Sequence, residues 1–393
     1  MLQRFALLIG LSVAMMACPK AKPEPSQAGT VTDFSAGKFS RSAVCKQCHV
    51  DIYQFWSVSA HATSYRNRNF QVAQQQFRQG AKPEDANLCV SCHAPLMLHA
   101  DSQTAYKEWK PVSTLEDEGV GCDFCHSIKA VDLASRTSPY TLEPGPIKFG
   151  PVADASDQEH GVVHSELFSQ STICAGCHEY KKPGTGLAII STYSEWQQTD
   201  HGTKGEHCQS CHMKVEPGNI VDPKVKRSDR PVNAHRMPGS HSRALLREAL
   251  RLRIDDLKQN GDRVEVTVVV ENKGGGHSIP TGMPTRKLEL EVEAATPAGL
   301  SYKERRVYQK VLVDDKGLSI VADSEAFLNA VAIKTDNRIA AGEERRESFS
   351  FPVPHTEQLT VRAHLIYSYS PQPDTLPEER LGVVSVEKSL AAR

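Results

Sequence analysis

A short motif, Cys-x-x-Cys-His, occurs five times in the first half of this 393-residue chain and constrains its fold more than any other feature. Two thiols three positions apart reach the two vinyl groups of one haem and form thioether bonds, and the next residue, histidine, supplies a nitrogen to the iron. Zinc sites and redox disulfides also use paired cysteines, but neither needs a histidine directly after each pair. The motifs therefore predict five covalently bound haem c groups. They comprise the pairs Cys45 and Cys48, Cys89 and Cys92, Cys122 and Cys125, Cys174 and Cys177, and Cys208 and Cys211, followed by the proximal histidines His49, His93, His126, His178 and His212.

The spacing of the motifs limits the kind of core that this region can build. Successive motifs start only 33 to 52 residues apart, which is too little chain to enclose each haem separately. Neighbouring porphyrins must share walls and take the place of a side-chain core. We therefore predict an α+β multidomain protein whose pentahaem domain, residues 41–244, is made of short helices and loops with little strand.

The remaining eleven histidines are the main source of sixth iron ligands, because most of the seven methionines lie in the leader or beside a proximal histidine. Bis-His ligation is therefore the default expectation, and it lowers the reduction potential relative to Met/His ligation. Trp-x-x-x-x-His occurs twice, ending at His61 and His201, and this repeated spacing favours both as ligands. The full set of candidates is His61, His160, His201, His235, His241 and His277.

Some of these choices stay open at the level of sequence. His160 and His164 precede the fourth motif together, and His160 is only slightly preferred. At least one of His235 and His241 is expected to ligate. His99 follows the second motif closely and is left undecided, whereas a surface or core position is expected for His207, His355 and His364.

From about residue 245 the pattern changes to period-two alternation, which is typical of half-buried strands. Residues 250–254 and 264–270 alternate around Asn260-Gly261, a strong hairpin signal. Further strand-like runs cover residues 287–293, 308–313, 330–334, 346–353, 359–368 and 382–387. Residues 245–393 are therefore predicted to form an antiparallel, immunoglobulin-like β-sandwich.

The N-terminus predicts export. A positively charged residue, Arg4, precedes an apolar run over residues 5–17, which is shorter than the ~20 residues of a membrane span. Cys18 follows and is the one cysteine outside the motifs, so we interpret residues 1–18 as a lipoprotein leader, with a conventionally cleaved signal peptide as the alternative. Residues 19–40 read as a flexible tether. The expected location is the periplasmic side of the outer membrane or the cell surface, with Cys18 as lipid anchor and no other membrane contact.

The haem segments resemble those of the cytochrome c-554/c-552 family. The first motif is followed by Tyr53, Trp56, Ser59 and His61 as in the opening haem segment of that family, and residues 119–126, 174–179 and 208–213 resemble its later segments. The resemblance spans about residues 40–245 and implies stacked haem pairs that relay electrons in the periplasm. The five motifs depart from the tetrahaem members.

Residues 276–286 resemble a segment that follows the haem region in larger multihaem cytochromes of metal- and nitrogen-cycling bacteria. There the histidine commonly approaches a haem, and the resemblance implies that role for His277. The preceding glycines, Gly274 to Gly276, permit a close backbone approach to a flat group.

Three functions are compatible with these features. The first is an electron conduit between redox partner proteins, and the second is an oxidoreductase that acts on a small nitrogen or sulfur compound at one open haem. The third is a structural subunit of a cytochrome assembly. Pentahaem nitrite reductase uses a lysine-terminated motif that is missing here, which favours the conduit. The nearly balanced charge, with 46 basic and 47 acidic residues, gives no indication of nucleic-acid binding.

Overall fold

The computed structural model describes residues 38–85, 87–100, 118–135, 139–155, 159–224, 230–353 and 358–391, without the side chains of residues 84 and 98–100. The predicted leader, the lipid-anchor candidate Cys18 and most of the tether lie outside these ranges. Within them, no helix is both long enough and apolar enough to cross a membrane. Residues 33–393 form one compact unit.

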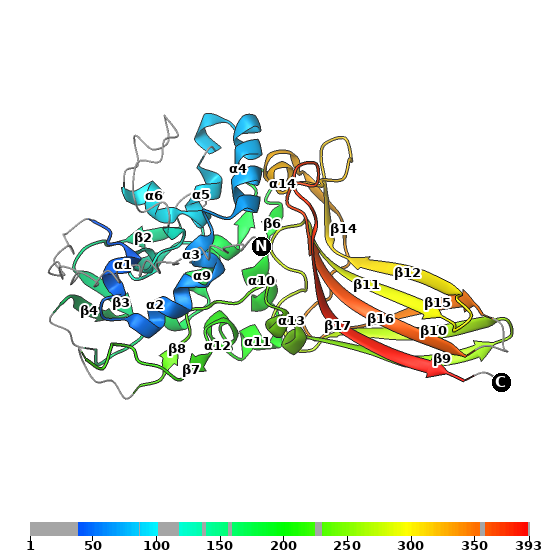
Figure 1. The fold of residues 1–393 in the computed structure, drawn as a ribbon. Coiled ribbons are helices and arrows are strands. Elements are labelled where there is room, and N and C mark those ends of the chain that lie inside the picture. Colours follow the sequence, from blue (N-terminus) through cyan, green and yellow to red (C-terminus); the bar gives the residue numbers. More distant parts are fainter. Residues whose placement is uncertain are drawn as a thin grey trace, which may run out of the picture. The chain divides into compact units, whose positions relative to one another are not determined.

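The haem region consists of short elements joined by loops, drawn in blue to green in Figure 1. Its helices are α1 (Ser42–Cys45), α2 (Val50–Ser57), α3 (Ala60–Thr63), α4 (Arg68–Gly80), α5 (Leu88–His93), α6 (Pro95–Ala100), α8 (Cys122–Cys125), α9 (Thr172–His178), α10 (Thr192–Gln197), α11 (Asp200–Thr203) and α12 (Cys208–His212), with the 3-10 turns η1 (Pro83–Asp85) and η3 (Glu166–Ser169). Its strands are β1 (Ile128–Val131), β2 (Tyr140–Leu142), β3 (Ile147–Gly150), β4 (Gly161–His164), β5 (Tyr180–Lys181), β6 (Ala188–Ile190), β7 (Val215–Glu216) and β8 (Val232–Asn233). No described strand here exceeds four residues, which agrees with the predicted shortage of strand.

Polar caps fix where several of these helices begin. The Ser59 hydroxyl accepts a hydrogen bond from the Ala62 amide at the start of α3, and the Asn67 side chain accepts two at the start of α4. Such caps satisfy amide groups that have no partner within the helix. They matter here because the helices are too short to be stable through propensity alone.

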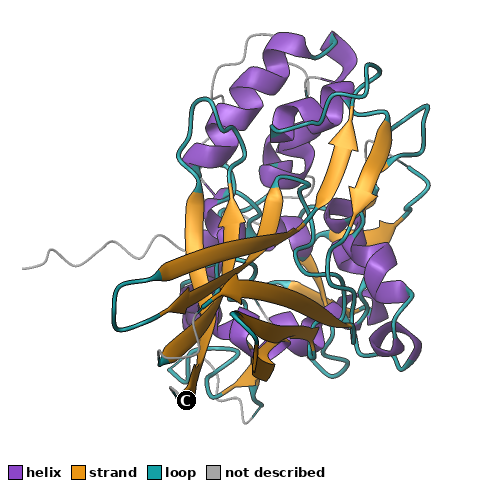
Figure 2. Ribbon diagram, turned by 90° about the vertical axis from the view of Figure 1, so that its right-hand side faces the viewer, coloured by secondary structure: helices purple, strands orange, loops and turns teal. Residues whose placement is uncertain are grey.

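The second half begins with helix α13 (Arg243–Ala249) and continues into long strands. These are β9 (Leu250–Asn260), β10 (Arg263–Asn272), β11 (Arg286–Ala295), β12 (Ser301–Tyr308), β13 (Lys310–Val313), β14 (Ala332–Asp336), β15 (Glu344–Pro352), β16 (Leu359–Tyr369) and β17 (Glu379–Leu390), with helix α14 (Asp323–Asn329) between β13 and β14. One sheet has the order β15-β10-β9 and the other β12-β11-β16-β17, all antiparallel. Figure 2 shows these long strands in orange, in contrast to the short purple helices.

The core of the sandwich comes from the alternation seen in the sequence. Val264, Val266, Val268 and Val270 of β10 share one buried cluster with residues of the other sheet such as Leu290. Gly261 has a φ of +60° in the β9–β10 turn, where the hairpin was predicted. The predicted fold class, an α+β chain with a haem-packed first half and an antiparallel sandwich, is confirmed.

Two details of the second half differ from the prediction. Strand β12 was missed because its sequence is highly charged, which suits a strand with one exposed face. Helix α14 was also missed. The strand expected at residues 330–334 follows this helix and starts at Ala332. The boundary at residues 244 and 245 remains a prediction, and it falls inside helix α13.

The two regions share an apolar cluster. Ile189 of β6 packs with Leu312, Ala326 and Ala330, all of which are inaccessible to solvent. Helices α4 and α14 also meet, where the rings of Phe77 and Phe327 lie edge to face with centroids 6.3 Å apart. The two regions are therefore joined by apolar contacts from both sides.

Candidate haem sites

Each Cys-x-x-Cys-His motif lies on a helical turn, and we number the motifs as sites 1 to 5 in chain order. At site 1 the His49 amide donates to the Cys45 carbonyl at 2.8 Å, and at site 3 the His126 amide donates to the Cys122 carbonyl at 3.0 Å. A helix places residues three and four positions apart on one face. The two thiols and the imidazole of a motif are therefore presented together, as one porphyrin requires. All ten motif cysteines are free thiols in the described structure.

Four of the five proximal histidines face a second histidine from a distant part of the chain. The ring centroids are 6.3 Å apart for His49 and His160, 6.2 Å for His178 and His61, 6.4 Å for His126 and His235, and 6.4 Å for His212 and His277. With metal–nitrogen bonds of about 2 Å, two imidazoles on opposite sides of one metal ion have their ring centres roughly 6 Å apart. The four spacings fit an iron between the rings.

Backbone carbonyls fix the orientation of most of these rings. The Nδ1–H groups of His49, His126 and His212 donate to the carbonyls of Ile220, Phe149 and Pro238, each at 2.7 Å. Among the facing histidines, Nδ1 of His235 donates to Asn233 at 2.7 Å, and that of His277 to Ser278 at 3.0 Å. A carbonyl cannot donate a proton, so these bonds assign the proton to Nδ1 and leave Nε2 free for a metal.

Burial keeps these imidazoles in the neutral form that binds metals. It lowers the pKa of His61 to about 4, of His235 to about 4 and of His178 to about 3. The rings of His61 and His235 nevertheless keep accessible surface.

Site 2 is different from the other four. The His93 ring stacks on Phe70 with centroids 4.0 Å apart, and its Nδ1–H donates to the Ser64 carbonyl at 3.4 Å. Burial lowers the pKa of His93 to about 4, although the residue is accessible. Among the described side chains, no imidazole faces His93. A second histidine at site 2 stays a prediction, because the side chain of His99 lies outside the described residues.

Two candidate ligands lie elsewhere. The ring of His201 is held by Glu206, with Nδ1 2.6 Å from Oε2, and no described proximal histidine faces it. The loop that carries His277 lies beside this ring, because a Cβ added to Gly276 would be 3.5 Å from His201 Cγ. His241 instead lies beside Glu379, Tyr367 and Tyr369.

The shared Trp-x-x-x-x-His spacing therefore has two different outcomes. Both tryptophans are buried and donate an indole hydrogen bond at 2.9 Å, Trp56 to the Val120 carbonyl and Trp196 to that of Glu206. Only His61 then faces a proximal histidine. Both copies of the repeat thus anchor an indole, and only the first also brings its histidine opposite a proximal ring.

The other spare histidines are placed away from the proximal rings. His164 lies 3.5 Å from a carboxylate oxygen of Glu166, and His207 accepts a hydrogen bond from the Ser171 amide at 3.2 Å. His364 belongs to strand β16, and His355 lies outside the described residues.

Thiols of different motifs meet, which shows which sites are neighbours. Side-chain contacts join Cys45 of site 1 to Cys122 of site 3, Cys92 of site 2 to Cys177 of site 4, and Cys174 of site 4 to Cys208 of site 5. Cys125 of site 3 also interacts electrostatically with both cysteines of site 4. Sites 1, 3 and 4 thus form a continuous row, and sites 2 and 5 both adjoin site 4.

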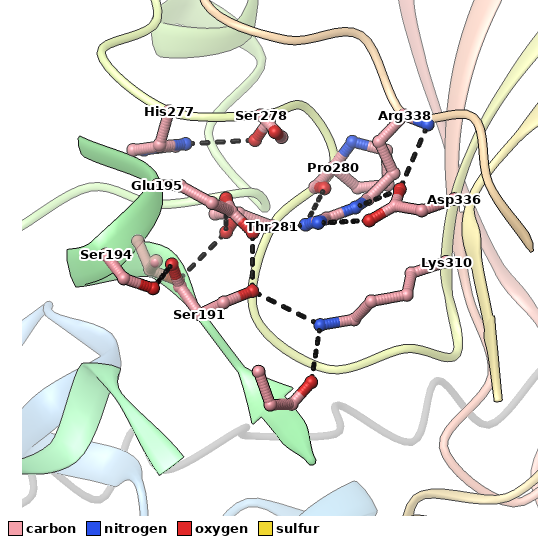
Figure 3. Close-up of polar contacts among 12 residues, drawn as sticks. Ser191, Ser194, Glu195, His277, Ser278, Pro280, Thr281, Lys310, Asp336 and Arg338 are labelled. Carbon is pink, nitrogen blue, oxygen red and sulfur yellow. Dashed lines mark hydrogen bonds and ion pairs between the residues drawn. The ribbon is translucent and has the colours of Figure 1, made fainter. Parts of the chain in front are cut away.

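The loop that carries His277 is held by polar contacts between the two regions (Figure 3). Asn272 donates from its side chain to the His277 carbonyl at 2.9 Å. Glu195 of helix α10 forms an ion pair with Arg338 at 2.7 Å and accepts a hydrogen bond from Thr281 at 2.8 Å. Burial alone would raise the pKa of Glu195, but Arg338 and the hydrogen bonds hold it below its ordinary value. The network fixes the loop against the haem region.

Comparisons with known proteins agree with this geometry. The sequence model of the family "Cytochrome c554 and c-prime" matches residues 44–127. The crystal structure of a penta-heme cytochrome c552 from Thermochromatium tepidum matches with 20% sequence identity and a TM-score of 0.69, covering 89% of this chain and 99% of that chain. The predicted resemblance and fold are thereby confirmed, and the family match supports covalently bound haem c, electron transfer and export in general terms.

Other solved structures match only part of the chain. A beta-glucuronidase from Bacteroides uniformis has 13% identity and a TM-score of 0.18, covering 37% of this chain and 13% of that chain. The putative ApaA protein from Bordetella pertussis has 9% identity and a TM-score of 0.20, covering 36% and 92%. No curated protein sequence matches the chain.

Proposed function

We propose that this chain is a pentahaem electron-transfer protein whose haems form a branched path through the first half of the molecule. The observation that carries the proposal is the set of four facing histidine pairs, at 6.2 to 6.4 Å. When bound, the haem groups supply one-electron redox chemistry. The chain itself supplies the thioether cysteines, the oriented imidazoles and the walls that separate the haems from water.

The contacts between motifs support the order of the path. Sites 1, 3 and 4 lie in a row, and the thiol contacts connect site 4 to both site 2 and site 5. Electrons that enter at site 1 would therefore reach a branch at site 4. Two imidazoles on each of four irons favour low reduction potentials, and a site that keeps both ligands in either redox state needs little rearrangement during transfer.

The assignment of five haems is tested by the mass of the purified, denatured protein. Because thioether bonds survive denaturation, the mass should exceed that of the processed chain by five haem groups. Fewer than five in fully matured protein would contradict the assignment. The oxidised protein should also show four low-spin haems by electron paramagnetic resonance, corresponding to the four histidine pairs.

Replacing His277 tests whether this residue pairs with His212, and so whether the sandwich supplies an imidazole to site 5. His277→Gly should open site 5 and add a high-spin signal that imidazole reverses. His201→Gly is the matched control, since His201 lies beside the same loop and is paired with Glu206. An unchanged low-spin spectrum in His277→Gly, or an equal change in His201→Gly, would refute the pairing of His212 with His277.

The location of the protein is proposed from the leader. Cys18 is proposed to carry the lipid anchor after export, which would hold the haem region at the periplasmic side of the outer membrane or at the cell surface. Cys18→Ala should release the protein from the membrane fraction without altering the haem spectrum. Equal partitioning of the variant and the parent would favour an ordinary cleaved leader.

A second candidate function rests on site 2. The observation that favours it is that, among the described side chains, no imidazole faces His93. An oxidoreductase that acts on a small nitrogen or sulfur compound would use such an open site, and the other four haems would supply or remove its electrons.

A further inference from the structure

The facing imidazoles of site 4 are oriented differently from those of the other three pairs. The ring planes of His61 and His178 make an angle of 63°. The corresponding angles are 35° at site 1, 27° at site 3 and 15° at site 5. Among these four pairs, only the rings of site 4 are closer to perpendicular than to parallel.

The backbone that carries His61 is held in place by the segment that precedes motif 3. The His61 carbonyl accepts hydrogen bonds from the Val120 amide and the Ser64 hydroxyl, each at 2.9 Å. Gly119 has a φ of +59°, and a Cβ at this position would collide with the same carbonyl oxygen. The close approach of these two segments therefore requires glycine. It positions helix α3, and with it the His61 ring, against site 4.

Hydrogen bonding also distinguishes site 4 from its neighbour, site 3. At site 3, the Nδ1–H groups of His126 and His235 each donate to a backbone carbonyl at 2.7 Å. At site 4, Nδ1 of His61 is inaccessible and has no hydrogen-bond partner, and the His178 ring forms no hydrogen bond among the described residues. A hydrogen bond donated by Nδ1–H makes the imidazole a stronger donor to a metal through Nε2. The imidazoles of site 4 are therefore the weaker donors to an iron.

Burial does not separate these two sites. It lowers the pKa of His61 to about 4 and that of His178 to about 3. At site 3, burial lowers the pKa of His126 and brings that of His235 to about 4. Both pairs of rings are thus removed from water, and site 3 is a matched comparison for site 4. The two sites differ in ring angle and in hydrogen bonding.

Both differences raise the reduction potential of an iron held at site 4. Parallel imidazole planes donate to the same iron d orbital, which holds the unpaired electron of low-spin ferric iron, so they stabilise the ferric form. Nearly perpendicular planes divide their donation between two d orbitals and lose this preference. Weak donors also stabilise ferric iron less than strong donors do. A haem at site 4 is therefore reduced more readily than a haem at site 3.

We propose that site 4 has the highest reduction potential of the four sites with facing histidines, so that an electron rests at the branch of the path. The contacts between motifs connect site 4 to sites 2, 3 and 5. An electron held there can leave toward any of these sites. The inference rests on the proposed electron-transfer function and adds to it the place at which the electron is held.

The test is a reductive titration of the intact haem protein, followed by electron paramagnetic resonance. Nearly perpendicular imidazoles leave two iron d orbitals close in energy and give a single feature at high g, whereas nearly parallel rings give a fully resolved spectrum. One low-spin haem of the oxidised protein should show the high-g feature, and this signal should be lost first as the potential is lowered. When site 3 is half reduced, site 4 should be reduced by about ten to one, which corresponds to about 59 mV for a one-electron couple.

Two variants assign the signals to their sites. His61→Gly should remove the high-g feature and leave the resolved spectra. His235→Gly is the matched control, because it should remove one resolved spectrum, that of site 3, and keep the high-g feature. A high-g feature that persists in His61→Gly, or that is lost after the resolved spectra in the titration, would overturn the inference.

The outcomes separate this inference from the electron-transfer proposal. Four low-spin haems without a high-g feature would overturn the inference and leave the conduit intact. Fewer than four low-spin haems would contradict the histidine pairs themselves. If His61→Gly does not mature, the titration of the parent protein still decides, because the order in which its signals are lost needs no variant.

Discussion

The haem region and the sandwich differ in the source of their cores. The sandwich has one continuous cluster that joins both sheets, including Leu290, Val266 and Phe351. The haem region has small clusters of three buried residues each, one around Val90 and one around Phe124. The sandwich is stabilised by its own side chains, whereas we expect the haem region to take most of its apolar contact from porphyrin faces. The two regions should therefore respond in opposite ways to loss of haem and to loss of core side chains.

The largest effect is expected when haem attachment is prevented. Replacing the ten motif cysteines by serine should unfold the haem region and leave the sandwich folded, because only the former loses its core. All three tryptophans precede residue 245, so their fluorescence reports the haem region alone. Limited proteolysis should leave a protected fragment that begins near residue 245. A protease-resistant haem region in the haem-free chain would remove the distinction between the two cores.

A cavity in the sandwich should destabilise the sandwich and leave the haem region unchanged. Leu290 is inaccessible, and Leu290→Ala should lower the free energy of unfolding of the sandwich by about 3–5 kcal/mol. The haem absorption spectrum at low denaturant should not change. Leu318 is 63% exposed, so Leu318→Ala is the control and should have an effect below about 0.5 kcal/mol. Equal losses in the two variants would show that this cluster does not stabilise the sandwich.

The ion pair between the regions tests how strongly they are coupled. The side chains of Glu195 and Arg338 are 13% and 8% exposed, so Glu195→Gln leaves a nearly buried cation with one partner fewer. We expect a loss of about 3 kcal/mol in the unfolding free energy, together with a larger separation of the haem-region and sandwich transitions in calorimetry. Glu344→Gln removes an exposed partner of Arg253 and should cost less than about 1 kcal/mol. Coincident transitions in the Glu195 variant would show that the coupling lies elsewhere.

The smallest effect on stability is expected for Lys310, a buried lysine of the sandwich that contacts strand β6 of the haem region. The Lys310 ammonium donates to the Ile189 carbonyl at 2.9 Å, and burial lowers its pKa from the ordinary 10.5 to about 8. The unfolded chain then binds more protons than the folded one between pH 8 and 10.5, so this group makes stability rise with pH across that window. The gain should be on the order of 1–2 kcal/mol. Lys310→Met should remove this slope, and a slope equal to that of the parent would contradict the assignment.

Local signals in the sequence predicted the elements well but the ligand pairs incompletely. Alternation identified the strands with bounds close to those observed, because each strand exposes one face. It failed at β12, where charged residues such as Arg305 and Glu304 occupy a paired strand. Among the ligand candidates, His160, His235 and His61 face proximal rings, whereas His201 and His241 do not. His201 as an iron ligand stays a prediction, and the described partner of its ring is Glu206.

The sequence alone determined which groups each haem motif supplies, namely two thiols and a proximal imidazole. These groups lie within one helical turn and need no tertiary contact to define them. It also indicated the sandwich, because period-two burial is a property of single strands. Only the tertiary structure decided which imidazole faces which, as with His61 and His178, because the facing imidazole comes from a distant segment whose position depends on the path of the whole chain. The same reason applies to His212, whose facing imidazole, His277, comes from the other region of the molecule.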